Sequence, residues 1–296
     1  MDDSDALDEA EFVTPNLLTE EERQEVFFEQ ILPVFYGNCG AVSCPSVHFL
    51  GGQPGAGKSF LQQIVASGLK RDGNDSVATI SIDDYREFHD HWDELLRQDD
   101  ETAGAWTNQD CWEWSRLAMS FVLERGCHVI CEGTLRNPGE TLADVNEYLE
   151  KGFRTELHIV AVHEFVSRLR YLSRYLREVR GRGVGRFIPR SFHDEAYHVL
   201  PESVATMVES GMFYQASIHG GTGQVIEQVR ADTPDAVHRV LTAVAEERNP
   251  VRLDEQALLD GIDRSLELAR HVNRPKAVEE LETLWRDVEN GLSGSA

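Results

Sequence analysis

The stretch VHFLGGQPGAGKS, residues 47–59, decides how this chain is organised. Its apolar start predicts a short buried strand, and residues 52–59 match the phosphate-loop pattern G-x-x-x-x-G-K-[ST]. Glycines in such a loop can take positive φ, so successive backbone N–H groups can turn toward a polyphosphate. Residues 60–65 predict a helix whose N-terminus faces the same anion. The order strand, loop, helix therefore predicts a site for a nucleoside triphosphate.

Two side chains of the loop add specific chemistry. Lys58 supplies a positive charge for the β- and γ-phosphates, and Ser59 offers a hydroxyl to Mg²⁺, the one metal role that we predict. The residues expected at the nucleotide are Gly52, Gln53, Pro54, Gly55, Ala56, Gly57, Lys58 and Ser59.

Charge and composition narrow the class of protein. The formal net charge of −24 argues against nucleic acid as a partner, because duplex binding needs a basic face. No run of eighteen apolar residues predicts a membrane span, and the acidic start has no signal-peptide core, so we expect a cytoplasmic protein. The cysteines show no C-x-x-C pair and predict reduced thiols rather than a zinc site; they are Cys39, Cys44, Cys111, Cys127 and Cys131.

The remaining pattern predicts an α/β fold, a P-loop kinase-like parallel sheet flanked by helices. Further strands are expected at 77–82, 127–131 and 156–162, a hairpin at 218–229, and helices at 108–125, 138–152 and 165–180. An acidic flexible tail (1–19), a kinase domain (20–232) and a C-terminal helical extension (233–296) follow from this division.

Several local features sharpen the prediction. Thr19 and Glu22 form a capping box for a helix that Pro33 is expected to end. Residues 73–75 predict a turn, 90–107 predict irregular chain, and Pro201 predicts a break in a helix that begins near Ser191.

Two acidic groups are expected beside the phosphate loop, because ligands sit outside the carboxyl ends of parallel strands. Asp83 follows the second strand, where it can be the base that accepts a proton from an attacking hydroxyl. The alternatives are a magnesium ligand acting through water and a helix cap, the latter supplied by Asp83 or Asp84. Glu132 and Thr134 follow the third strand and suit a polyol substrate, although Thr134 can also be a loop cap.

Positive charge is concentrated in one segment. Eight arginines fall within residues 168–190 against one acid, Glu178, and predict a lid over a transferred phosphoryl group; they are Arg168, Arg170, Arg174, Arg177, Arg180, Arg182, Arg186 and Arg190. His193 and His198 are interpreted as surface residues of a helix. The tryptophans at 106, 112 and 114 are interpreted as packing or pocket residues.

Together these motifs resemble the zeta toxin family of bacterial P-loop kinases. The resemblance covers roughly residues 20–215 and lies in FLGGQPGAGKS at 49–59, IDDYR followed by His89, and ICEGT followed by Arg136. Arg174, and Arg186 with Pro189, complete it, although the spacing between the two arginines differs from the family pattern by one residue.

The resemblance implies an ATP- and Mg²⁺-dependent kinase that phosphorylates a hydroxyl of UDP-N-acetylglucosamine, blocks cell-wall synthesis, and is silenced by a small helical antitoxin. Lys58 and Ser59 then serve ATP and Mg²⁺, Asp83 is the base, and Arg174 and Arg186 contact the transferred phosphate. Glu132, Thr134 and Arg136 match the positions that hold the sugar substrate.

Two alternatives remain open. A kinase of the same architecture can act on another acceptor, such as an antibiotic or a different nucleotide. The second alternative is a nucleotide-gated interaction module, and the lack of D-x-x-G and N-K-x-D motifs argues against this hypothesis.

Overall fold

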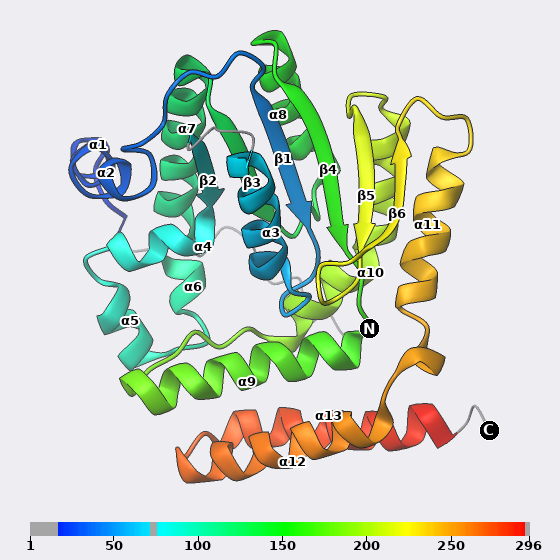
Figure 1. The fold of residues 1–296 in the computed structure, drawn as a ribbon. Helices are drawn as coiled ribbons and strands as arrows, with labels where there is room; N and C mark the ends of the chain where they lie inside the picture. The colour runs from blue at the N-terminus through cyan, green and yellow to red at the C-terminus, as the bar shows by residue number, and fades with distance from the viewer. Residues whose placement is uncertain (1–16, 72–75, 294–296) are drawn as a thin grey trace, which may run out of the picture.

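A six-stranded sheet forms the centre of the molecule in the computed structural model, which describes residues 17–71 and 76–293 (Figure 1). The strand order is β2-β3-β1-β4-β5-β6, with the first five strands parallel and β6 antiparallel at the edge. The predicted α/β sheet and the hairpin are therefore confirmed. The strands are β1 (Ser46–Gly51), β2 (Val77–Ser81), β3 (His128–Gly133), β4 (Arg154–Val160), β5 (Gln215–His219) and β6 (Val225–Arg230).

Helices cover one face of this sheet with an apolar core. The covering helices are α7 (Asn108–Arg125), α8 (Pro138–Glu150), α10 (Arg190–Glu209) and α11 (Ala236–Glu247). Alternate strand residues point to this side because side chains of a strand alternate between faces, and Val47, Val129 and Leu157 are fully buried there. Gly126 ends α7 in the left-handed conformation, as the sequence predicts.

The opposite face carries α3 (Lys58–Arg71), which lies in front of the sheet in Figure 1. Leu50, Ile130 and Val160 pack there against Leu61 of α3. Since β1 runs straight into the phosphate loop and α3 begins at Lys58, this packing fixes the loop between a buried strand and a helix that is anchored on the sheet by Leu61.

A second apolar core lies below the sheet. It joins α9 (Glu164–Arg182) to the consecutive helices α12 (Glu255–His271) and α13 (Pro275–Ser293). Both run alongside α9 in Figure 1. Arg168 of α9 is fully buried and donates from Nη1 to Asp287 Oδ2 of α13 at 2.8 Å. The C-terminal helices therefore hold α9, which carries most of the arginine run.

The N-terminal helical segment shows one confirmed and one wrong prediction. Thr19 and Glu22 form the predicted capping box of α1 (Glu20–Val26). The helical path does not end at Pro33, however, because it continues through a π-helical turn (Phe27–Ile31) into α2 (Leu32–Phe35). The wider turn precedes Pro33, which lies in the first turn of α2, where a missing N–H costs little.

Two other local predictions are wrong. Residues 90–107 are not irregular throughout, since they contain α5 (Trp92–Gln98) and α6 (Ala103–Trp106), which bury a small apolar cluster with Leu95 and Leu96. Pro201 does not break α10, because buried residues on both sides of it, Leu200 and Val204, anchor the helix on the core. That burial offsets the roughly 3 kcal/mol cost of an internal proline.

Other predictions fall partly or wholly outside the described residues. These are the turn at 73–75 and residues 1–16 of the predicted tail. Within the described part of the chain, no helix combines the length and apolar character needed to cross a bilayer.

Candidate functional site

The phosphate loop connects β1 to α3 and takes the backbone shape that its glycines permit. Gly52, Gly55 and Gly57 have φ values of +154°, +78° and +114°. At Gly55 a β-carbon would lie only 2.1 Å from the carbonyl oxygen of Ser167, so the loop passes against α9 too closely for any side chain.

Lys58 lies across this loop. Its Nζ donates to the carbonyl oxygens of Gly52 at 2.9 Å and Gln53 at 3.4 Å. Burial lowers the pKa of Lys58, the carboxylates of Glu132 and Asp83 oppose that shift, and two arginines add to it. The ammonium group therefore lies among the groups predicted at the site, where an incoming phosphate can exchange with the loop carbonyls.

Gln53 has a different role from the one predicted from the motif alone. Its side chain is fully buried, and Nε2 donates to the Val162 carbonyl at 3.0 Å and to Ser167 Oγ at 3.2 Å. Its Oε1 accepts from Arg248 Nη2 at 3.2 Å. Gln53 thus fixes the loop to β4, α9 and the end of α11, and only its backbone can face a nucleotide.

Asp83 lies just past β2, in the short helix α4 (Ile82–Tyr85). Its Oδ2 is 2.5 Å from Arg186 Nη1, and its Oδ1 accepts from Arg86 Nε at 3.3 Å. Burial raises the pKa of Asp83, but Arg186, and then Arg86, outweigh this effect and hold the pKa well below its usual range. The low pKa keeps the carboxylate ionised, and because the side chain is 53% exposed, a substrate can reach it.

The helix-cap alternative is wrong for Asp83 and Asp84 as N-cap residues, although Asp84 shares a side-chain hydrogen bond with the N-cap residue Ser81. The residue at the N-cap of α4 is Ser81, and it makes no side-chain cap bond. Asp84 lies near two other carboxylates. Desolvation, together with Glu132 and Asp83, raises the pKa of Asp84 to about 6. A cluster of carboxylates therefore meets the loop lysine at the rim of the sheet.

Glu132 belongs to the same group. It pairs in register with Ser81 of β2 and with Leu50 of β1, near the carboxyl ends of these strands. Burial raises the pKa of Glu132, while Lys58 and a hydrogen bond with Ser59 lower it. The magnesium-ligand candidate Ser59 and the acid Glu132 are therefore direct neighbours.

Arg174 and Arg186, the two arginines predicted to contact the transferred phosphate, both contact Glu178. Glu178 accepts from the backbone N of Arg186 at 3.1 Å and lies 3.7 Å from Nε of Arg174. Arg174 acts electrostatically on both Lys58 and Glu132. Glu178 is thus a positioning residue that the sequence shows only as the single acid within the arginine run.

Thr134 and Arg136 lie farther along the same loop. Thr134 is half-buried, and Leu135 beside it adopts φ of +53°, a strained value for a side chain of this size. The guanidinium of Arg136 pairs with Glu195 Oε2 at 2.5 Å and lies 4.1 Å from the Phe192 ring centre. Arg136 is therefore engaged by α10 rather than by the Asp83 group.

The arginine run does not form one lid. Arg170 donates to the loop carbonyl of Ala56 at 3.1 Å, and Arg182 pairs with Glu87 at 2.9 Å. A helix distributes its side chains around its axis, so the arginines of the run meet different partners: Arg170 holds the phosphate loop itself, whereas Arg174 and Arg186 act on the charged groups around Lys58.

His193 is not a surface residue, because it is fully buried: its Nδ1 donates to Asp194 Oδ1 at 2.9 Å, and its Nε2 lies 2.9 Å from Ser167 Oγ. His198 is exposed, as predicted.

Trp114 is a core residue whose indole N–H donates to the Arg23 carbonyl at 2.9 Å, whereas Trp112 is exposed.

Comparison with known proteins gives a consistent result. The sequence profile of the zeta toxin family matches residues 38–226. The chain is 24% identical to Toxin zeta of Streptococcus pyogenes over 248 residues, which are 82% of this chain and 85% of that protein. Toxin zeta of Enterococcus hirae is 25% identical over 62% of this chain and 63% of its own length.

Solved structures show the same fold. A chain from the PezAT chromosomal toxin–antitoxin system of Streptococcus pneumoniae superposes with a TM-score of 0.70 and 17% identity, covering 88% of this chain and 99% of that chain. A complex of AvrRxo1-ORF1 and AvrRxo1-ORF2 with ATP gives 0.52 and 13%, covering 90% and 83%. Since the family profile spans more than half of the sequence, the chain belongs to the zeta toxin family.

Proposed function

We propose that this protein transfers the γ-phosphoryl group of magnesium ATP to a hydroxyl of a nucleotide-activated sugar, UDP-N-acetylglucosamine. The observation that carries the proposal is the open, ionised Asp83 carboxylate held by Arg186 beside the lysine of the phosphate loop. Phosphoryl transfer needs this set: a base for the hydroxyl, and cations for the charge on the transferred group.

Each residue has a stated role in the proposed reaction. The loop N–H groups and Lys58 bind the phosphates, and Ser59 holds Mg²⁺. The hydroxyl oxygen bonds to the γ-phosphorus, the bond to the ADP oxygen breaks, and the hydroxyl proton passes to Asp83. Glu132 and Thr134 orient the sugar, and Arg136 would exchange Glu195 for an anionic group of the substrate.

Arg186 links nucleotide binding to base activation. Its guanidinium neutralises Asp83 in the structure, and a carboxylate held in that way is a weak base. A γ-phosphate competes for the same guanidinium, so the arginine stabilises the transferred group while the carboxylate regains proton affinity. Glu178, bonded to the backbone of Arg186, keeps the arginine within reach of both positions.

The activity is tested by incubating the purified protein with magnesium ATP and separate acceptors, then identifying products by mass spectrometry. A phosphorylated UDP-N-acetylglucosamine that Asp83→Asn fails to make supports the proposal. Exclusive phosphorylation of an aminoglycoside or another nucleotide would move the chain to the alternative kinase class. Slow ATP hydrolysis with no acceptor product would favour an interaction module.

We also propose that the protein acts in the cytoplasm as a toxin with a small helical antitoxin as partner. The fold neighbours from the PezAT system and the AvrRxo1-ORF1 and AvrRxo1-ORF2 complex support this assignment. Expression of the wild-type chain should stop bacterial growth, whereas Asp83→Asn should not. Co-expression of the adjacent reading frame should restore growth. Growth arrest by both the wild type and Asp83→Asn would contradict the proposal that toxicity requires catalysis.

The division at residues 232 and 233 also stays a proposal. In support, α12 and α13 pack on α9 apart from the sheet, whereas α11 of the proposed extension packs on the sheet core.

A further inference from the structure

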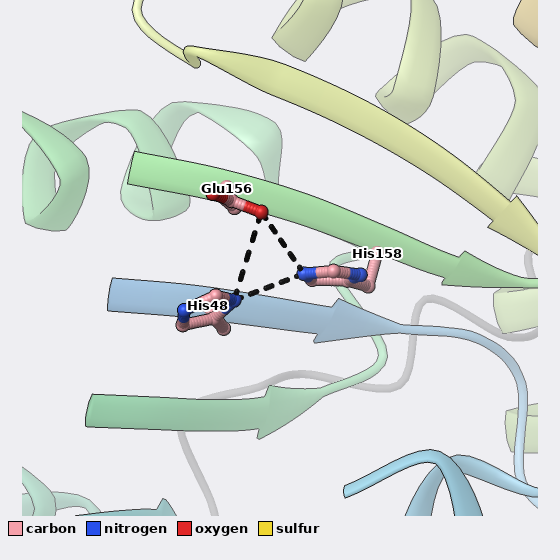
Figure 2. A group of neighbouring side chains, drawn as sticks. All are labelled: His48, Glu156 and His158. Carbon is pink, nitrogen blue, oxygen red and sulfur yellow. Dashed lines mark hydrogen bonds and ion pairs between the residues drawn. The ribbon is translucent and has the colours of Figure 1, made fainter. Parts of the chain in front are cut away.

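A polar group is buried inside the sheet, away from the carboxylates at its rim. His48 of β1 and the pair Glu156 and His158 of β4 lie on the same sheet face, and each side chain is buried (Figure 2). The register explains this grouping, because His48 lies directly opposite Glu156 and alternate residues of β4 share a face. Nothing in the proposed phosphoryl transfer uses these three side chains.

The three facing atoms have the spacing of metal ligands. His48 Nδ1 and His158 Nε2 are 3.0 Å apart, and Glu156 Oε2 is 3.9 Å from the first and 3.8 Å from the second. Zinc bonds of about 2.0–2.2 Å in a tetrahedral arrangement place ligand atoms about 3.3 Å apart. Shifts of a few tenths of an ångström would therefore bring all three atoms onto one ion.

Hydrogen bonds on the far side of His158 leave an unshared electron pair on Nε2, the nitrogen that faces the other two ligands. The Gly223 carbonyl can only accept, so His219 Nδ1 donates to it at 3.3 Å and His219 Nε2 must accept. His158 Nδ1, 3.1 Å from that nitrogen, is then the donor, and His158 Nε2 is unprotonated in the neutral ring. The network therefore aims a ligand nitrogen at the site.

The other two ligands also have partners behind them. Ser46 Oγ lies 2.9 Å from His48 Nε2, so it can accept a hydrogen bond from the Nε2–H group when Nδ1 binds a metal. Arg154 Nη2 is 2.7 Å from Glu156 Oε1, the carboxylate oxygen remote from the site. Metal-binding histidines and carboxylates are oriented by such outer contacts, and here each of the three ligands has one.

We propose that His48, Glu156 and His158 bind a zinc-class divalent transition metal, with water as the fourth ligand. Two imidazoles and one carboxylate suit zinc or cobalt better than the hard ion Mg²⁺, which prefers oxygen. Such an ion would join β1 to β4 four residues before Gly52, and would stabilise the strand that leads into the phosphate loop.

The test uses the full chain freed of metal by chelator dialysis, without nucleotide. Zinc should bind at one equivalent per chain and raise the thermal midpoint by roughly 5–10 °C at a hundredfold excess over its Kd. Cobalt should give tetrahedral d–d absorption without sulfur-to-metal charge-transfer bands, and Mn²⁺ should bind more weakly than either. No retained zinc, or thiolate bands from the cysteines, would overturn the proposal.

Variants locate the ion. His158→Gln should weaken zinc binding at least 100-fold, whereas His271→Gln, an exposed histidine of α12, should leave it unchanged. Arg154→Gln, which removes the outer contact of Glu156 and leaves all three ligands in place, should weaken binding about 10–100-fold and keeps the test valid should His158→Gln misfold. Equal zinc affinity in wild type and Arg154→Gln would place the metal elsewhere and refute the assignment.

Discussion

Replacing Arg186 by alanine separates its two proposed roles. The guanidinium neutralises Asp83 in the structure, where their atoms are 2.5 Å apart, and it is proposed to stabilise the transferred phosphoryl group. Loss of an arginine with that second role lowers turnover by about 10³–10⁵-fold. Since the Asp83 side chain is 53% exposed, the pair itself adds at most about 1 kcal/mol to folding, so unfolding cannot explain such a loss.

The pH profile gives the second readout. Arg186 is the largest of the effects that lower the pKa of Asp83, so its removal must raise that pKa toward the ordinary value, while Arg86 still lowers it. The base must be ionised in the free enzyme, so the acidic limb of kcat/KM should move to higher pH in Arg186→Ala. In the wild type this limb lies at lower pH because the carboxylate loses its proton so readily.

The measurement is a continuous ADP-release assay across pH, with ATP affinity measured separately. Arg182→Ala is the matched control, because this arginine of the same segment pairs with Glu87 and Asp93, and it should keep near wild-type turnover. The reasoning fails if Arg186→Ala retains wild-type kcat, or if its acidic limb coincides with that of the wild type.

Three further outcomes are expected. Asp83→Asn should lower turnover about 10²–10⁴-fold with nearly unchanged ATP affinity by calorimetry; a collapse of ATP affinity would instead indicate the magnesium role. Arg248→Ala should cost about 1.5–3 kcal/mol in urea unfolding, because Gln53 loses a charge-assisted partner, and an unchanged unfolding midpoint would contradict that role. Asp287→Ala should destabilise more than Arg168→Met, since it leaves a buried guanidinium unpaired, and the reverse order would refute this view of α9.

The phosphate loop and its rim were predictable because local sequence sets them. Glycine spacing determines the loop, and parallel strands bring Asp83 and Glu132 to one edge whatever surrounds them. Tertiary partners were not predictable in this way. The buried state of His193 depends on Ser167, twenty-six residues away, and the brace on Gln53 depends on Arg248, 195 residues away.

The arginine segment shows the same limit. Its density predicted cations near the phosphate, and two of them do act on Lys58. Which two could not follow from density, because every arginine has the same charge and the choice depends on which acid each one meets after folding. Glu178 makes that choice for Arg174 and Arg186, and a lone acid in a basic run carries no pattern of its own.

The buried attachment of α9 to α13 has a consequence for the proposed binding of ATP. A helix anchored along its length by Leu172, Leu176 and the Arg168–Asp287 bond cannot swing as a flap. The short link between α9 and α10, which carries Arg186, is anchored in the same core through Phe187 and Ile188. With backbone and core already in place, we expect ATP to bind by exchange of side-chain partners at Arg186, which favours fast engagement over a slow, large-scale gate.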